Sequence, residues 1–144
     1  MEQTLAIIKP DAVRDRQVGQ IISEIEKRKL RIATIKTLQM TEDEVGRFYE
    51  IHRGKSFFQE LIDFMSSGQI FVLVLERENA IEEWRRLIGQ TDPARAEAGT
   101  IRRRFGTSLM QNTVHGADSI SSAEREIDFF FGEKTCAISR SGPK

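Results

Sequence analysis

The most informative stretch of the chain is Leu5-Ala6-Ile7-Ile8-Lys9-Pro10-Asp11. Its first four residues form a continuous apolar run, which is typical of a buried β-strand. Lys9-Pro10-Asp11 then supply a cation, a residue that stops the strand and a capping residue. A second apolar run, Ile70 to Leu75, predicts another buried strand. Polar side chains are therefore expected to gather where the first strand ends.

Apolar residues at helical spacing predict five amphipathic helices. They are expected over residues 18–29, 41–52, 57–68, 79–89 and 121–132, with an extended stretch over residues 32–40. Two matches to the capping box support their starts, Thr41-Glu42-Asp43-Glu44 and Ser121-Ser122-Ala123-Glu124. Asn79 with Glu82 is expected to cap the fourth helix. Residues 90–120 show no period and are expected to form a long functional loop.

The composition indicates one compact domain over residues 1–144, and the pattern of residues 133–144 indicates an irregular tail. The 144 residues are 39% apolar, and 22 basic side chains balance 22 acidic ones. A net charge of zero argues against general nucleic-acid binding. Cys136 is the only cysteine, which excludes a disulfide framework and predicts a cytoplasmic location. The apolar runs are too short for a membrane span or a signal segment.

Gly54-Lys55-Ser56 resembles the end of a phosphate-binding P-loop, but the pattern requires glycine where Tyr49 stands. Other nucleotide-kinase and hydrolase motifs are also absent. Instead, cations and a hydroxyl gather near the ends of predicted elements, where such groups bind phosphates. A highly charged surface would also produce such positions by chance. The residues concerned are Lys9, Lys55, Arg85, Thr91, Arg102, Arg103 and Arg104.

His115 is the strongest catalytic candidate, because glycine follows it and would allow a ligand to approach the backbone. An imidazole can act as a base, a ligand or a nucleophile, and either Glu126 or Asp118 could orient it. A loop histidine without a task is the alternative. His52 ends an apolar helical stripe and is expected to pack in the core.

Phe57 is expected to face away from the helical stripe, beside Lys55. It could stack a nucleobase there or pack under the loop. The spacing of His52, His115 and Cys136 matches no structural zinc site.

Several blocks, in order, resemble the nucleoside diphosphate kinase family over about residues 3–132. They are Ala6-Ile7-Ile8-Lys9-Pro10-Asp11-Ala12-Val13, Tyr49, Phe57-Phe58, Gly89-Gln90-Thr91-Asp92-Pro93-Ala94, Gly99-Thr100-Ile101-Arg102 and Asn112-Thr113-Val114-His115-Gly116-Ala117-Asp118. The resemblance implies an α+β, ferredoxin-like domain with a four-stranded antiparallel sheet and helices on one face. Periodicity alone does not choose between that sheet and a parallel one, and it misses a fourth strand around Thr113 to His115.

The resemblance also implies an enzyme. It would transfer the γ-phosphoryl group of a nucleoside triphosphate, mainly ATP, to a nucleoside diphosphate, with ribose or deoxyribose. The route would be a ping-pong cycle through a pros-phosphohistidine at His115. Lys9, Tyr49 and Glu126 would assist His115, with Glu126 orienting its ring. Nucleotide binding would fall to Lys9, Lys55, Phe57, Leu61, Arg85, Thr91, Arg102, Leu109 and Asn112.

Mg²⁺ is the implied cofactor, carried by the nucleotide phosphates with no direct protein ligand and an optional water-mediated contact to Asp118. Lys55 replaces a frequent arginine, Ala117 replaces a frequent serine, and Leu109 is bulkier than the frequent valine. A homo-oligomer is expected, with a tetramer favoured. The alternative is a non-catalytic ferredoxin-like nucleotide-binding module.

Overall fold

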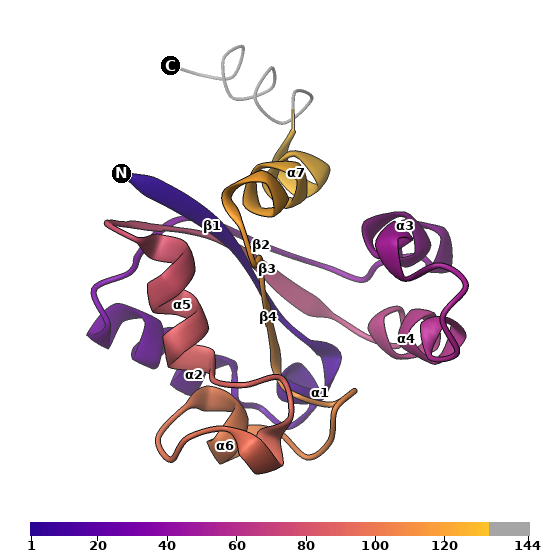
Figure 1. Ribbon diagram of the computed structural model, residues 1–144, viewed down its shortest axis with the longest axis horizontal. Helices are drawn as coiled ribbons and strands as arrows, with labels where there is room; N and C mark the ends of the chain where they lie inside the picture. The colour runs from indigo at the N-terminus through magenta and orange to yellow at the C-terminus, as the bar shows by residue number, and fades with distance from the viewer. Residues whose placement is uncertain (133–144) are drawn as a thin grey trace.

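One antiparallel sheet with the strand order β2-β3-β1-β4 organises residues 1–132, which are the residues that this computed structural model describes (Figure 1). The strands are β1 (Glu2–Ile8), β2 (Arg31–Leu38), β3 (Ile70–Arg77) and β4 (Val114–Gly116). The α-helices are α1 (Pro10–Arg14), α2 (Val18–Lys27), α3 (Glu42–Phe48), α4 (Phe58–Met65), α5 (Ala80–Ile88), α6 (Ile101–Phe105) and α7 (Ile120–Phe131). The antiparallel ferredoxin-like arrangement is thus confirmed.

The helices cover both faces of the sheet, whereas the resemblance predicted helices on one face. Ala6 and Ile8 of β1 point into a core formed with α2 and α5. Leu5 and Ile7, between them in sequence, point into a second core formed with α3, α4 and α7. Figure 1 shows these two groups of helices on opposite sides of the strands. Because both faces of β1 are covered, its sequence is a continuous apolar run rather than an alternating one.

Several predicted element boundaries are confirmed. The Thr41 hydroxyl accepts from the Glu44 backbone N–H while the Glu44 carboxylate accepts from the Thr41 N–H, which is the predicted capping box. Helix α5 ends at Gly89, whose φ of 86° lies in the left-handed region. A Cβ atom there would lie 2.6 Å from the Thr100 hydroxyl, so only glycine fits this turn.

Three capping predictions are wrong. Asp11 does not cap α1, because Lys9 is the N-cap and the Asp11 carboxylate accepts from the Thr113 N–H. Asn79 is the N-cap of α5 but forms no capping bond, and the Ile81 N–H donates instead to the Glu2 carboxylate of β1. The cap of α7 is Ser119, two residues before the predicted box. Both carboxylates thus link residues that are distant in sequence.

The expected long loop over residues 90–120 contains regular structure. A 3₁₀ turn (Pro93–Arg95) follows α5, and α6 then begins where the Thr100 hydroxyl accepts from the Arg103 N–H. Strand β4 closes the segment beside β1. These elements have only three to five residues, which is too short for a period to be visible.

Within residues 1–132, no helix is long and apolar enough to cross a membrane. The predicted irregular tail and Cys136 lie outside the described residues.

Candidate active site

His115 lies on β4, opposite Ile7 of β1, with its side chain 17% exposed. Its Nε2 atom is 2.8 Å from Oε1 of Glu126, a buried carboxylate on α7. A carboxylate accepts at this distance, so we assign the imidazole proton to Nε2. The lone pair is then on Nδ1, and the ring is in the tautomer that a nucleophile needs. The structure thus places Glu126, and not Asp118, against the imidazole.

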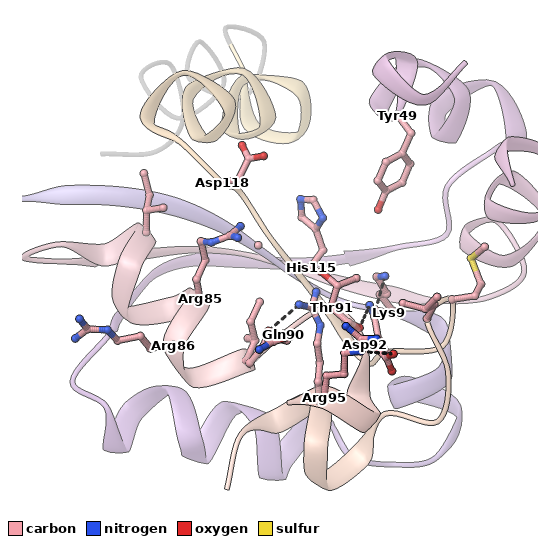
Figure 2. A pocket seen from close by; sticks show the side chains of 18 of the residues that line it. Lys9, Tyr49, Arg85, Arg86, Gln90, Thr91, Asp92, Arg95, His115 and Asp118 are labelled. Carbon is pink, nitrogen blue, oxygen red and sulfur yellow. Dashed lines mark hydrogen bonds and ion pairs between the residues drawn. The ribbon is translucent and has the colours of Figure 1, made fainter. Parts of the chain in front are cut away.

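Tyr49 is the C-cap residue of α3, and its ring lies edge-on to that of His115, with ring centroids 6.1 Å apart. Its hydroxyl is buried and has no hydrogen-bond partner within residues 1–132. Burial, reinforced by the charge of Glu126, raises the pKa of Tyr49. The side chains of Tyr49 and Arg85 point toward the His115 ring from opposite sides (Figure 2). Tyr49 therefore offers an unused, protonated hydrogen-bond donor beside His115.

A chain of hydrogen bonds connects Lys9, Asn112 and Thr91. The Lys9 ammonium donates to Oδ1 of Asn112 at 2.7 Å, and Nδ2 of Asn112 donates to the Thr91 carbonyl at 3.0 Å. Burial, together with the positive charge of Arg102, lowers the pKa of Lys9 to about 7, although Asp11 opposes the shift. An anion near Lys9 would restore its charge, so this position is suited to a phosphate.

Arg102 is buried and joins two backbone segments. Its Nη1 donates to the Gly89 carbonyl at 3.0 Å and its Nη2 to the Val114 carbonyl at 2.8 Å. Its Nε has no partner among the described residues. Burial and the positive charge of Arg85 lower the pKa of Arg102 to about 10. Arg85 itself is exposed at the wall of the cleft.

Thr113, between Asn112 and β4, has a φ of 81°. A β-branched residue in this left-handed region is strained by about 1–3 kcal/mol. Its N–H donates to the Asp11 carboxylate at 3.1 Å and its carbonyl accepts from the Lys9 N–H at 2.9 Å. Burial raises the pKa of Asp11, while Lys9 and backbone N–H groups oppose the shift.

These side chains lie along an open cleft of about 1770 Å³. One part of its wall is cationic and includes Lys9, Arg85 and Arg102, and another part is apolar. The apolar part includes Phe57 and Leu109, which are 40% and 63% exposed, and the buried Leu61. Such a cleft has room for an elongated ligand with an anionic part and a flat apolar part.

The cleft brings together most, but not all, of the predicted binding residues. The lining includes Lys9, Tyr49, Phe57, Leu61, Arg85, Thr91, Arg102, Leu109, Asn112, His115 and Asp118. Lys55 is exposed and does not line the cleft, and its ammonium lies 5.9 Å from the Phe57 ring. Arg103 and Arg104 also lie elsewhere, because they hold the Ala94 carbonyl and the Glu24 carboxylate.

His52 is a cleft residue and not the core residue that its helical spacing predicted. Helix α3 ends at Phe48 and a 3₁₀ turn (Glu50–His52) follows, so the helical period does not reach this side chain. The His52 ring stacks on the Tyr49 ring, with ring centroids 6.0 Å apart, and lies tilted against the Phe57 ring, with ring centroids 5.3 Å apart. Burial and the nearby Lys55 lower its pKa.

Sequence reasoning also missed Trp84 of α5. Its indole N–H donates to the backbone carbonyl of His115 at 3.1 Å. Its place in an apolar stripe indicated only a core residue, and no local signal indicates a bond to β4. The conformation of Thr113 likewise has no sequence signal, because a β-branched residue is not expected at positive φ.

Among residues 1–132, no three His, Cys, Asp or Glu side chains lie close enough together to hold a metal ion. Asp118, which follows β4, is an exposed carboxylate on the same cleft wall as His115. Near His115 the described residues thus offer the carboxylates of Glu126, which binds the imidazole, and of Asp118, which is exposed, and they form no ligand cage.

Known proteins are similar to this chain in sequence and in fold. The sequence model of the nucleoside diphosphate kinase family matches residues 2–136. A nucleoside diphosphate kinase from a Nitratiruptor species is 48% identical over 134 residues, which cover 93% of this chain and 98% of the relative. Nucleoside diphosphate kinase 1 from Protochlamydia amoebophila is 50% identical over 130 residues, covering 90% and 92%.

Solved structures of nucleoside diphosphate kinases have a similar fold. The nucleoside diphosphate kinase of Aquifex aeolicus has a TM-score of 0.89 and 39% identity, covering 93% of this chain and 97% of its own. The enzyme of Halobacterium salinarum, solved in complex with CDP, has a TM-score of 0.90 and 34% identity, covering 93% and 90%. The chain therefore belongs to the nucleoside diphosphate kinase family.

Proposed function

We propose that this nucleoside diphosphate kinase works through Nδ1 of His115. The lone pair of Nδ1 attacks the γ-phosphorus of a nucleoside triphosphate, mainly ATP, and forms a P–N bond. The bond from that phosphorus to the β–γ bridging oxygen breaks, and the nucleoside diphosphate leaves with the bonding electrons. A terminal phosphate oxygen of a second diphosphate then attacks the phosphohistidine and releases the imidazole. The contact between Nε2 and Glu126 carries this proposal, because it leaves Nδ1 as the free nitrogen.

Phosphate binding is assigned to the cationic part of the cleft wall. Lys9, Arg85, Thr91 and Arg102 line it, and the Tyr49 hydroxyl, which has no partner among residues 1–132, can donate to the transferring group. Preorganised donors of this kind stabilise the charge of a loose phosphoryl-transfer transition state. Lys55 reaches the phosphates only if its exposed side chain turns into the cleft, and it would act there as a point charge.

The nucleoside is assigned to the apolar part. Phe57 and Leu109 would hold the two faces of the base over Leu61, and none of them reads base edges. The amide of Asn112 is oriented by Lys9 and Thr91 and keeps one free N–H and one free lone pair for a ribose 3′-hydroxyl. The structure of the Halobacterium salinarum relative with CDP supports acceptance of pyrimidine nucleotides.

The residues present fit Mg²⁺ that arrives on the nucleotide. Asp118 is the carboxylate of the wall that could hold it through a water molecule, and the remaining ligands would be phosphate oxygens. Bound Mg²⁺ would neutralise phosphate charge during transfer. The protein supplies the nucleophile, its orientation by Glu126 and the cations of the wall.

A homo-oligomer, with a tetramer favoured, is part of the proposal. Among residues 1–132, β2 is an edge strand that pairs with β3 alone, and Ile35 on it is 42% exposed. A second copy can extend the sheet by pairing along this edge. Light scattering at micromolar concentration should give the tetramer mass, and a monomer would contradict this part. The cytoplasmic location stays a prediction from the sequence.

The non-catalytic binding module is not favoured, because the family and the relatives are kinases. Steady-state kinetics test the proposal directly. With ATP and GDP as varied substrates, double-reciprocal plots should be parallel lines, as a ping-pong cycle requires. His115→Asn should still bind ADP and form no GTP. Intersecting lines, or an active His115→Asn protein, would overturn it.

A further inference from the structure

Asp11 is a buried carboxylate for which the proposed reaction has no use. It is 4% exposed, lies at the second position of α1 and does not line the cleft. Its Oδ2 accepts the backbone N–H of Thr113 at 3.1 Å, across 102 positions of the sequence. Thr113 is fully buried. A buried carboxylate that accepts a backbone N–H from a distant loop needs an explanation beyond local capping.

Thr113 is the residue that needs such support, because its φ is 81°. A β-branched side chain disfavours this backbone conformation, so surrounding contacts must hold it. Asp11 holds the N–H of Thr113, and the Lys9 N–H holds its carbonyl at 2.9 Å. The N–H and the carbonyl of Thr113 thus bind to Asp11 in the first turn of α1 and to Lys9, its N-cap residue.

The strained residue separates two functional groups. Asn112, just before it, is joined to the Lys9 ammonium, and His115 follows two residues after it on β4. A change of φ at residue 113 would rotate the Asn112 amide relative to the His115 ring. Rotation of this kind would also move the ring relative to Lys9. The cleft geometry near the nucleophile therefore depends on this one backbone conformation.

We propose that Asp11 is a positioning residue for phosphoryl transfer. As a hydrogen-bond acceptor it holds Thr113 in the left-handed conformation and so sets His115 relative to Lys9 and Asn112. The proposal rests on His115 being the nucleophile. A different role is also conceivable in chemical terms, in which the negative charge of Asp11 acts on Lys9. Asp11→Asn distinguishes the two roles, because asparagine keeps the hydrogen-bond acceptor and removes the charge.

Three variants separate these roles. Asp11→Ala, without the acceptor, should lower kcat by about 10- to 100-fold with a smaller change in KM, since misplacement of the reacting groups slows the transfer step. Asp11→Asn should stay within about threefold of the wild type, because its Oδ1 can accept the same N–H. Asp15→Ala, an exposed carboxylate that follows the same helix, is the matched control and should change neither constant.

A double-mutant cycle with Thr113→Gly supplies a readout that a purely structural role would not move. Glycine adopts positive φ without strain, so Asp11→Ala should cost kcat much less in the Thr113→Gly background than in the wild type. If Asp11→Ala does not fold, Asp11→Leu, which fills a similar volume without an acceptor, takes its place in the cycle. Thermal unfolding identifies the folded variants.

The outcomes are distinct. Loss of activity in Asp11→Asn equal to that in Asp11→Ala would overturn the proposal in favour of a charge effect. An equal loss of kcat in both Thr113 backgrounds, or no loss at all, would also overturn it. Formation of phosphohistidine by the wild type and by Asp15→Ala is measured in the same series. Its failure in those two proteins would contradict the proposed function itself and not only this inference.

Discussion

Nε2 of His115 lies 2.8 Å from Oε1 of Glu126, which is the closest described link between the candidate nucleophile and α7. The carboxylate is buried and is positioned by the helix that begins after Asp118. This contact selects one imidazole tautomer and one ring orientation. It would also stabilise the ring when Nδ1 carries a phosphoryl group.

The first prediction follows from that contact. Glu126→Gln removes the negative charge but keeps the size of the side chain, so the ring loses its charged acceptor. We expect kcat to fall by about 10- to 100-fold, with little change in KM or thermal stability. Steady-state kinetics with ATP and GDP measure this. Glu124→Gln, on the exposed side of the same helix, is the control, and an equal effect there would contradict the assignment.

The burial of Lys9 predicts that the free energy of unfolding of the nucleotide-free protein depends on pH. Burial lowers the pKa of Lys9 from 10.5 to about 7, so between these values the unfolded chain binds a proton that the folded chain does not. The contribution of Lys9 to the free energy of unfolding should therefore rise with pH above about 7, by up to about 1.4 kcal/mol per pH unit. It should level off near 10.5, the unfolded value.

Urea unfolding of the wild type and of Lys9→Met, without nucleotide, measures this difference between pH 7 and pH 9. The wild type should gain stability relative to the variant as the pH rises. A difference that is independent of pH would mean that the Lys9 ammonium stays charged in the folded protein.

Phe57 predicts the tolerance for different bases. If its ring stacks the base, Phe57→Ala should weaken the binding of ADP and CDP by similar factors, about tenfold, because stacking contributes about 1–3 kcal/mol with little base preference. Calorimetric titration of both nucleotides tests this. Ile51→Ala is the matched control, since Ile51 is 78% exposed and does not line the cleft. Weaker binding of ADP alone would show that the site reads the base.

Trp84 leaves no room for a side chain at residue 116, next to His115. A Cβ atom at Gly116 would lie 2.7 Å from Cδ1 and 2.8 Å from Nε1 of Trp84. Gly116→Ala should therefore lower the free energy of unfolding by about 1–3 kcal/mol and reduce kcat, because β4 must shift. The penalty should be smaller in a Trp84→Phe background, which chemical unfolding of the four proteins measures. Equal penalties in both backgrounds would exclude this contact as the cause.

Local sequence signals predicted the elements well where a period or a cap was complete within a few residues. The stripes of α2 and α5 and the Thr41 capping box are examples, because helical spacing and capping are local effects. The continuous apolar run of β1 was also a sign of helices on both faces, although the resemblance pointed to one face.

Relationships across the chain could not be predicted from residue patterns. The strand order places β4 beside β1 and so brings His115 near Lys9, which only the family resemblance anticipated. The bonds from Glu2 to the start of α5 and from Asp11 to Thr113 span 79 and 102 positions and have no local signature. His52 was misplaced because a 3₁₀ turn replaced the expected last turn of α3.

The most direct test of the central claim is to label the protein. The enzyme is mixed with γ-labelled ATP and Mg²⁺ without an acceptor, and the stability and position of the label are determined. Nδ1 of His115 should carry a label that acid removes and alkali does not, and GDP or CDP should discharge it. Nucleotide binding without any labelled histidine, or a label on another residue that GDP discharges, would contradict the account.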